Sequence, residues 1–349
     1  MLQEKIGNIM RLNRFFYYIF SFLFFLIPPA LLRWYCRNRL AEQNLHNTYY
    51  IMKRVNYYNK LRSTFTVDTH MTMVEKYRQT GGSAYYIDLY KVIKCFPDSF
   101  RFHYINGDVV DVPEVPSFLK SRPISDTNSH SVLLKLNRVR HYNFIRDKIR
   151  FQDKKPMAVW RGDGFRQNRR DLVRKFKDHP WLDVARVDIK KASVDDDISH
   201  FARKMTVSEQ LNYKFIISLE GKDVATNLKW IMSSNSVCIM PKPKYETWFM
   251  EGKLKAGVHY IEVKDDYSDL LQKMNYYLEH EEEALDIIAN ANSWVEQFKF
   301  PRRERLISLL VAQKYFEKSG QWDDVLISEP TLKSLLAGQF CKLLYVINI

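Results

Sequence analysis

The chain has 349 residues, enough for two domains, and a hydrophobic fraction of 46%, which excludes an intrinsically disordered protein. Its four cysteines contain no CxxC pair, a spacing that argues against a disulfide scaffold and a structural zinc site and favours a reducing compartment. The net charge of +14 favours an anionic partner such as nucleic acid, an acidic lipid surface or a phosphorylated substrate.

The amino-terminal segment combines positive charge with a long apolar run. Residues 1–63 carry ten basic and two acidic side chains, more than half of the net charge. Residues 15–32 are uncharged, and as one helix they would span about 27 Å, close to the thickness of a bilayer core. Pro28 and Pro29 should break this helix, which leaves residues 15–27, a short length for a membrane span.

We expect residues 1–40 to form a membrane-associated helix that lies in the interface, with tyrosines and arginines at headgroup level. Arginines flank the apolar run on both sides, so the charge asymmetry of a spanning helix is absent. No small-residue cleavage site precedes the basic stretch, which argues against a signal peptide. A single transmembrane anchor and a buried core helix remain alternatives.

The next part of the chain is predicted to form an α/β domain over residues 41–153. Residues 83–95 are predicted as a strand followed by a helix, and residues 100–105 alternate as a strand does. Three prolines predict an irregular connection over residues 112–123. Apolar residues at helical spacing predict a helix over residues 131–150, and a polar stretch that follows marks a domain boundary.

Residues 154–320 are predicted as a second domain in which strands alternate with helices, followed by a tail over residues 321–349. Strands are expected at residues 157–160, 181–187, 214–219, 236–240 and 260–263. Helices are expected at residues 168–176, 207–212, 225–233 and 267–279. This alternation predicts parallel βαβ units of Rossmann type, with ligands at the carboxyl ends of the strands.

Polar and glycine-rich stretches follow several of these strands. Residues 160–170 combine a glycine turn with arginines and suit phosphate, although the pattern also fits a solvated basic helix. Residues 218–230 fit either a second phosphate turn or a capped surface helix. Residues 240–252 place a glutamate among aromatics, which fits a ribose and base site or a packing cluster. Asp108 follows a glycine turn and is either a general base or a turn residue. No histidine or cysteine spacing indicates a metal site.

One long segment resembles a known family. Residues 214–263, KFIISLEGKDVATNLKWIMSSNSVCIMPKPKYETWFMEGKLKAGVHYIEV, resemble the signature of glycosyltransferase family 90, the capsule-associated and lipopolysaccharide-modifying family. The stretches AVWRG…NRR, KSRPI and SVLLKLNRVRH resemble its bacterial branch, the lipopolysaccharide core glycosyltransferases of the LpsA type. The resemblance implies a GT-B-like fold of two Rossmann-type domains facing across a cleft, and an inverting reaction that needs no metal or other cofactor.

The resemblance also implies substrates and site residues. A UDP-sugar would donate a hexose or pentose to a lipopolysaccharide core or related lipid-linked glycan, at the cytoplasmic face of the inner membrane. The implied donor-binding residues are Arg161, Gly162, Arg169, Ser218, Gly221, Asn227, Lys229 and Glu246. Eukaryotic members carry an arginine where this chain has Asn227, which makes Lys229 the candidate source of positive charge.

The implied general base is Asp108, with Asp111 and Glu114 as neighbouring alternatives. Two other functions remain open. The charge fits a nucleic-acid-binding protein, but the basic residues cluster beside an apolar helix, so no nucleic acid is expected. The presence of Asn227 where eukaryotic members have an arginine also fits a non-catalytic membrane-associated scaffold that keeps a transferase fold.

Overall fold

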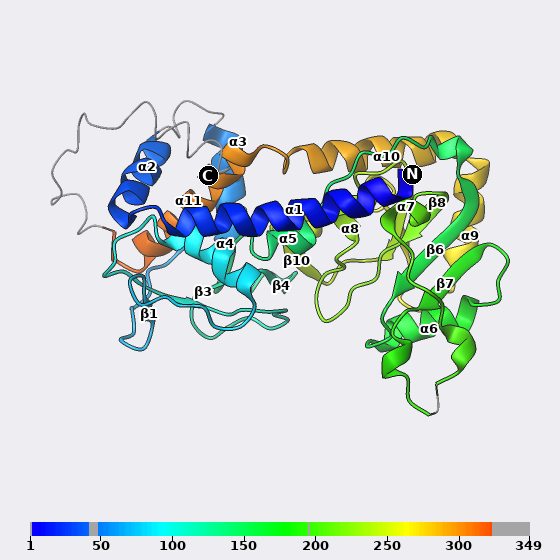
Figure 1. Cartoon of the computed structure of the whole chain (residues 1–349), viewed down its shortest axis with the longest axis horizontal. Coiled ribbons are helices and arrows are strands. Elements are labelled where there is room, and N and C mark those ends of the chain that lie inside the picture. Colours follow the sequence, from blue (N-terminus) through cyan, green and yellow to red (C-terminus); the bar gives the residue numbers. More distant parts are fainter. Residues whose placement is uncertain (1, 42–47, 195, 323–349) are drawn as a thin grey trace. The chain divides into compact units, whose positions relative to one another are not determined.

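The computed structural model describes residues 2–41, 48–194 and 196–322, and these divide into two compact units (Figure 1). The first unit comprises residues 140–297 with the first helical residues, 2–13, and the second comprises residues 14–139 and 298–322. The predicted domain boundaries are at residues 40/41, 153/154 and 320/321. The predicted tail lies outside the described residues beyond residue 322.

The first unit is built on a five-stranded sheet in which all strand pairs are parallel, in the order β11-β9-β8-β6-β7. Its strands are β6 (Lys155–Gly162), β7 (Leu182–Arg186), β8 (Tyr213–Ile217), β9 (Val237–Pro241) and β11 (Ile261–Val263). This order is doubly wound, and the winding reverses between β6 and β8. The predicted mixed α/β fold with a parallel sheet is confirmed.

Helices and short turns precede, connect and follow these strands. They are η2 (Phe151–Asp153), α6 (Gln167–Phe176), η3 (Ile189–Lys191), η4 (Ile198–His200), α7 (Val207–Gln210), α8 (Leu228–Ile231), η5 (Glu251–Lys253), α9 (Leu270–Glu279) and α10 (Glu281–Glu296). A further short strand, β10 (Tyr245–Thr247), follows β9. Thr206 begins α7 with a capping box, because its hydroxyl accepts from the Glu209 N–H while the Glu209 carboxylate accepts from the Thr206 N–H.

Alternating residues of the strands form the main hydrophobic core of this unit. Phe215 and Ile217 of β8 share one face of the sheet with Val237 and Ile239 of β9. The same core contains buried side chains from α6, α9 and α10, so these helices supply its cover. The strands read as short apolar runs because both faces of a parallel sheet are covered.

The second unit contains a smaller sheet in the order β1-β2-β3-β5, in which β1 is antiparallel to β2 and the other pairs are parallel. Its strands are β1 (Thr72–Met73), β2 (Arg101–Tyr104), β3 (Ser117–Leu119) and β5 (Ser131–Leu133), and β4 (Ser121–Pro123) lies between the last two in the chain. Its helices are α2 (Pro29–Ala41), α3 (Thr48–Tyr58), α4 (Ser83–Ile93) and α11 (Pro301–Lys318). Two further helices contain residues of both units: α1 (Leu2–Phe25) and α5 (Arg138–His141).

Helix α11 packs on this smaller sheet, although the predicted boundary placed it in the carboxyl-terminal domain. The ring of Tyr315 lies 4.4 Å from that of Phe118 on β3, measured between centroids. Arg54 of α3 forms a buried ion pair with Glu304 of α11. These contacts tie the end of the described chain to its amino-terminal half.

Three predicted elements differ from the structure. Residues 83–93 are wholly helical, so the predicted strand there is wrong. Residues 131–150 contain β5 and the four-residue α5 instead of a long helix. All three residues of β5 are buried, so apolar side chains follow one another there without the alternation of a half-exposed strand. Such a run can be mistaken for part of the apolar face of a helix. Residues 112–123 contain β3 and β4 despite their prolines, which fall outside β3 and at the end of β4.

The amino-terminal apolar run forms two helices. Helix α1 ends at Phe25 and α2 begins at Pro29, which confirms the predicted break. Among the described residues no single helix is long and apolar enough to cross a membrane; residues 14–25 and 29–40 pass that test only as a pair, bent by 108°.

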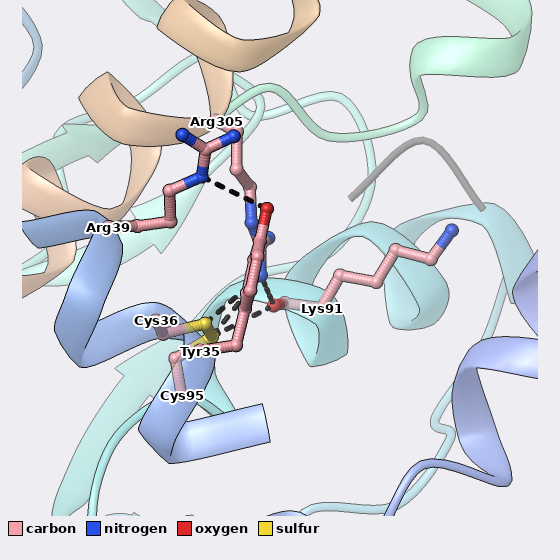
Figure 2. The surroundings of a disulfide bond; sticks show 6 residues. All are labelled: Tyr35, Cys36, Arg39, Lys91, Cys95 and Arg305. Carbon is pink, nitrogen blue, oxygen red and sulfur yellow. Dashed lines mark hydrogen bonds between the residues drawn. A yellow bond between two sulfur atoms is a disulfide. The ribbon is translucent and has the colours of Figure 1, made fainter. Parts of the chain in front are cut away.

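The second unit contains a disulfide bond between Cys36 of α2 and Cys95, which follows α4 (Figure 2). The cysteine spacing argued against a disulfide scaffold and did not predict this single bond. The two residues are 59 positions apart, and only the packing of α2 near α4 brings their Cα atoms to 5.7 Å. Cys238 is a buried thiol on β9, and Cys341 lies outside the described residues.

Candidate functional site

A cavity of about 120 Å³ lies in the first unit at the carboxyl ends of the parallel strands. Residues that follow β6, β8, β9 and β11 line it, among them Asn168, Ser218, Glu220, Lys244, Asp265 and Tyr267. Ligands of doubly wound sheets bind in the crevice at this edge, where the winding reverses. The cavity therefore lies at the edge where the sequence predicted ligand binding.

Glu220 is the most strongly perturbed carboxyl group of this cavity. Its Oε1 accepts hydrogen bonds from the backbone N–H groups of Lys244 and Tyr245, each at 3.1 Å. Burial raises the pKa of Glu220 to about 7, and the charge of Glu251 adds to this effect, although the two N–H donors oppose it. A carboxyl group poised near neutrality in a cavity is a typical ligand-binding group.

Arg169, at the start of α6, connects two of the loops that follow the strands. Its Nη2 donates to the carbonyl oxygen of Leu219 at 3.0 Å, and its Nη1 lies 3.0 Å from Asp163 Oδ1. A Cβ atom on Gly221 would lie 3.1 Å from the same Nη2. Glycine at position 221 thus lets the guanidinium pass close to the backbone, and the structure brings these two predicted residues together.

Arg161 and Gly162, predicted to accompany Arg169, have other contacts. Arg161 donates to the carbonyl oxygen of Asp183 on β7 at 2.7 Å and forms an ion pair with its carboxylate. It does not line the cavity. A Cβ atom on Gly162 would lie 2.5 Å from the ring of Trp160, so glycine is needed there for packing.

Ser218 and Asn227 lie together beside the cavity. The Ser218 hydroxyl donates to Asn227 Oδ1 at 3.1 Å, and Asn227 Nδ2 donates to the carbonyl oxygen of Ile217, also at 3.1 Å. Ser218 lines the cavity, while Asn227 holds the turn that leads into α8. The amide at position 227 therefore orders the loop after β8 without adding a charge.

Lys229, the predicted substitute for an arginine, is engaged in a buried ion pair. Its Nζ lies 2.6 Å from Glu251 Oε1, and both side chains are almost fully inaccessible to solvent. Glu251 also accepts from the N–H and hydroxyl of Thr247 and contributes to the cavity wall. Lys229 thus contacts the cavity through Glu251.

Glu246, the predicted acidic residue before the aromatic pair, is buried on β10 and does not line the cavity. Glu220 occupies the lining instead. Glu220 follows the strand predicted over residues 214–219, at the edge where ligands are expected, but no specific role was predicted for it, because only the fold shows its burial. Tyr267 was also missed. Its backbone has a φ of 59°, and its hydroxyl donates to the carbonyl oxygen of Asn168 at 2.9 Å.

Asp108, the predicted base, lies in the second unit after β2. Its Oδ1 lies 2.6 Å from Nζ of the buried Lys120 and 3.4 Å from the hydroxyl of Tyr85. The carboxylate stays partly accessible, whereas Asp111 and Glu114 are exposed. The Asp108 carboxylate and the Lys120 ammonium therefore form an ion pair within the second unit.

The described residues contain no group of three or more histidines, cysteines, aspartates or glutamates arranged to hold a metal ion. That the transfer reaction needs no metal ion remains a prediction.

Comparisons with known proteins agree with the resemblance. A model described as Glycosyl transferase family 90 matches residues 125–300, which include all five strands of the larger sheet and the cavity. Over 297 residues the chain is 41% identical to O-glucosyltransferase LpsA of Dichelobacter nodosus, covering 83% of this chain and 91% of that protein. It is 26% identical to Protein O-glucosyltransferase 3 of Homo sapiens over 175 residues, covering 50% of this chain and 34% of that protein. It is 28% identical to Protein O-glucosyltransferase 2 of Danio rerio over 132 residues, covering 37% and 26%.

Proposed function

Because this chain belongs to glycosyltransferase family 90, as an LpsA-type glycosyltransferase, we propose that it transfers a hexose from a UDP-sugar to a lipopolysaccharide core or a related lipid-linked glycan. The names of its relatives favour glucose over a pentose. Family membership argues against a primary role in binding nucleic acid or as a scaffold. The observation that carries the proposal is the cavity at the strand ends, where a carboxyl group and an arginine-bearing helix start lie near each other.

The donor would bind with its nucleoside in the cavity. The ribose hydroxyls can donate to the Glu220 carboxylate, which keeps acceptor capacity beyond its two backbone donors. The diphosphate would lie near Arg169 and the backbone of Gly221, with Lys244 as a second cation at the cavity. This arrangement supplies positive charge to the leaving group without a metal ion.

The proposed reaction inverts the anomeric centre. The acceptor hydroxyl oxygen forms a bond to the anomeric carbon while the bond from that carbon to the UDP oxygen breaks. The hydroxyl proton passes to the Asp108 carboxylate, and UDP leaves with the electron pair of the broken bond. Asp108 would act in a GT-B arrangement, from the domain opposite the donor.

We further propose that the protein works at the cytoplasmic face of the inner membrane, with α1 lying in the interface. The side chains of Phe15, Ile19 and Phe22 are exposed at helical spacing on α1, and Leu26, just after the helix, is exposed as well. Tyr17 and Phe24 are buried on the other side of the helix. One face of α1 thus belongs to the core of the second unit, and the other offers an apolar surface to lipid.

A donor screen tests the proposal. UDP-glucose, UDP-galactose, UDP-xylose and ADP-glucose are each added to the full chain with EDTA present, and the melting temperature is measured. Only the UDP-sugars should raise it, and UDP-glucose should also protect the Lys273→Gln variant, which changes an exposed residue of α9. Equal protection by ADP-glucose, or none by any UDP-sugar, would reject the proposed donor.

A further inference from the structure

A second cavity, of about 170 Å³, lies within the second unit. Helices α1, α4, α5 and α11 contribute to its wall, together with residues just before α5 and α11. Its charged lining residues are the cations Lys91, Lys135, Arg138 and Arg305 and the anions Asp88 and Glu304. Positive groups therefore outnumber negative groups in a space that the proposed transfer reaction does not use.

Both carboxylates of this cavity are already committed to partners. Asp88 accepts from the hydroxyl of Tyr17 at 2.9 Å and from the backbone N–H of Arg138 at 2.8 Å, and the Arg138 Nε lies 3.2 Å away. Glu304 pairs with Arg54, a further cation from α3. These acids leave the remaining positive charge of the cavity unbalanced.

Lys91 and Arg305 have no carboxylate partner within the described part of the chain. Lys91 Nζ donates to the Ser21 hydroxyl of α1 at 3.0 Å and lies 5.5 Å from the ring centre of Phe24. Arg305 donates from Nη2 to the Lys91 carbonyl oxygen at 2.6 Å and contacts Cys95 Sγ at 3.2 Å (Figure 2). The Nε of Arg305 is buried and has no hydrogen-bond acceptor.

The unfavourable burial of these two cations lowers their pKa values. Burial lowers the pKa of Lys91 to about 7, and repulsion from Arg138 lowers it further than the attraction of Asp88 raises it. Burial also lowers the pKa of Arg305 to about 10. A buried charge without a counter-ion is unfavourable, so an anion that entered this cavity would be bound strongly.

Helix α1 relates this cavity to the proposed membrane surface. Tyr17, Ser21 and Phe24 face the cavity residues, while Phe15, Ile19 and Phe22 are exposed on the other side of the helix. Helix α1 therefore carries both a wall of the cavity and the apolar face that is proposed to contact lipid.

We propose that this cavity binds the phosphate of an anionic lipid head group, held by Lys91, Arg138 and Arg305. The proposal rests on the membrane attachment in the proposed function. It gives α1 a second role, because the helix then forms one wall of a lipid site as well as an apolar contact with the bilayer. Binding there would neutralise the buried cations of α4 and α11 and favour the membrane-bound state.

Vesicle flotation of the full chain tests this, with phosphatidylcholine vesicles that contain or lack phosphatidylglycerol. Lys91→Gln and Arg305→Gln should each weaken binding to the anionic vesicles roughly tenfold and leave binding to the neutral vesicles unchanged. Lys53→Gln, which removes an exposed charge from α3 of the same unit, is the matched control and should change little. Thermal melts confirm that each variant is folded.

The Phe22→Ser variant distinguishes binding at this site from general attachment to the membrane. It should weaken binding to both the anionic and the neutral vesicles. The proposal is overturned if Lys91→Gln and Arg305→Gln bind anionic vesicles as Lys53→Gln does. It is also overturned if inorganic phosphate raises the melting temperature as much as short-chain phosphatidylglycerol at equal concentration, since the cavity would then take a free anion. UDP binding by the same variants should be unchanged, so failure here leaves the donor site unaffected.

Discussion

Arg169 Nη2 donates to the carbonyl oxygen of Leu219 at 3.0 Å, and this bond joins the helix start after β6 to the loop after β8. These two strands flank the point where the winding of the sheet reverses. The guanidinium is fixed there by its backbone acceptor and by Asp163. Arg169 does not itself line the cavity, but its acceptor Leu219 directly precedes Glu220, which does.

Replacing Arg169 should therefore weaken the binding of UDP. We expect Arg169→Ala to lower UDP affinity and turnover by roughly ten- to a thousand-fold, the scale of one to three charge-assisted hydrogen bonds. Isothermal titration of UDP in EDTA measures the effect. Arg174→Ala changes a more exposed arginine on the same helix and serves as control. Equal affinities for the two variants would remove Arg169 from the donor site.

Glu220 should make nucleoside binding depend on pH. With its pKa raised to about 7, the group is mostly protonated at pH 6 and mostly ionised at pH 8. Ribose hydroxyls donate better to the carboxylate, so uridine affinity should rise several-fold across this range. Uridine has no phosphate to titrate, which makes it the right probe. Titration of Glu220→Gln should give no such rise; a rise that persists in this variant would assign it to another group.

The same carboxyl group should affect stability. Its folded pKa lies above its ordinary value of 4.5, so the folded state binds the proton more tightly than the unfolded state. The resulting stabilisation is complete below pH 4.5 and is lost as pH rises towards 7. Urea unfolding of the wild type and of Glu220→Gln between pH 5 and 8 should show a steeper loss in the wild type. Parallel curves would contradict this.

Asp108 should be required for the chemical step. The amide of Asp108→Asn keeps the size of the side chain but cannot accept the acceptor's proton. We expect turnover to fall by about two to four orders of magnitude while UDP-sugar affinity is retained. Asp111→Asn, which changes an exposed neighbour, should behave as wild type. The reverse result would move the role to Asp111, and normal turnover in both would reject this part of the mechanism.

The Cys36–Cys95 disulfide should stabilise the second unit. Closing a loop of 59 residues restricts the unfolded chain by about 4 kcal/mol in the entropic account. Cys36→Ser should lower the free energy of unfolding by about this amount in non-reducing buffer, and a reducing agent should do the same to the wild type alone. Non-reducing peptide mapping should find the linked peptides. Free thiols at both positions would contradict the bond.

The sequence predicted the larger sheet well because most of its strands are short apolar runs, and several of them are followed by a turn and a helix. It also placed Arg169, Ser218 and Gly221 after strands that the fold sets side by side. Local pattern could not reveal pairings that depend on tertiary register. Arg161 forms an ion pair with Asp183 only because β6 and β7 are adjacent in the sheet. Nothing in the sequence around Lys229 predicts its buried ion pair with Glu251.

The same limit explains the other differences. Residues 131–133 form a buried strand because β3 lies beside them, and their apolar side chains carry no sign of this partner. The pKa of Glu220 depends on burial by loops that follow other strands. Cys36 and Cys95 form a disulfide because α2 packs near α4, and no sequence motif predicts this packing.

In the proposed reaction, a UDP-sugar is the donor for transfer to a lipid-linked glycan. The most direct measurement follows UDP release from UDP-glucose in EDTA, with a lipopolysaccharide core acceptor that lacks its terminal glucose, and quantifies the glucosylated product by mass spectrometry. We expect one UDP to be released for each sugar transferred, and we expect Asp108→Asn to lose both release and transfer while it still binds UDP-glucose. No UDP release or transfer by the wild type with any UDP-sugar, or undiminished transfer by Asp108→Asn, would contradict it.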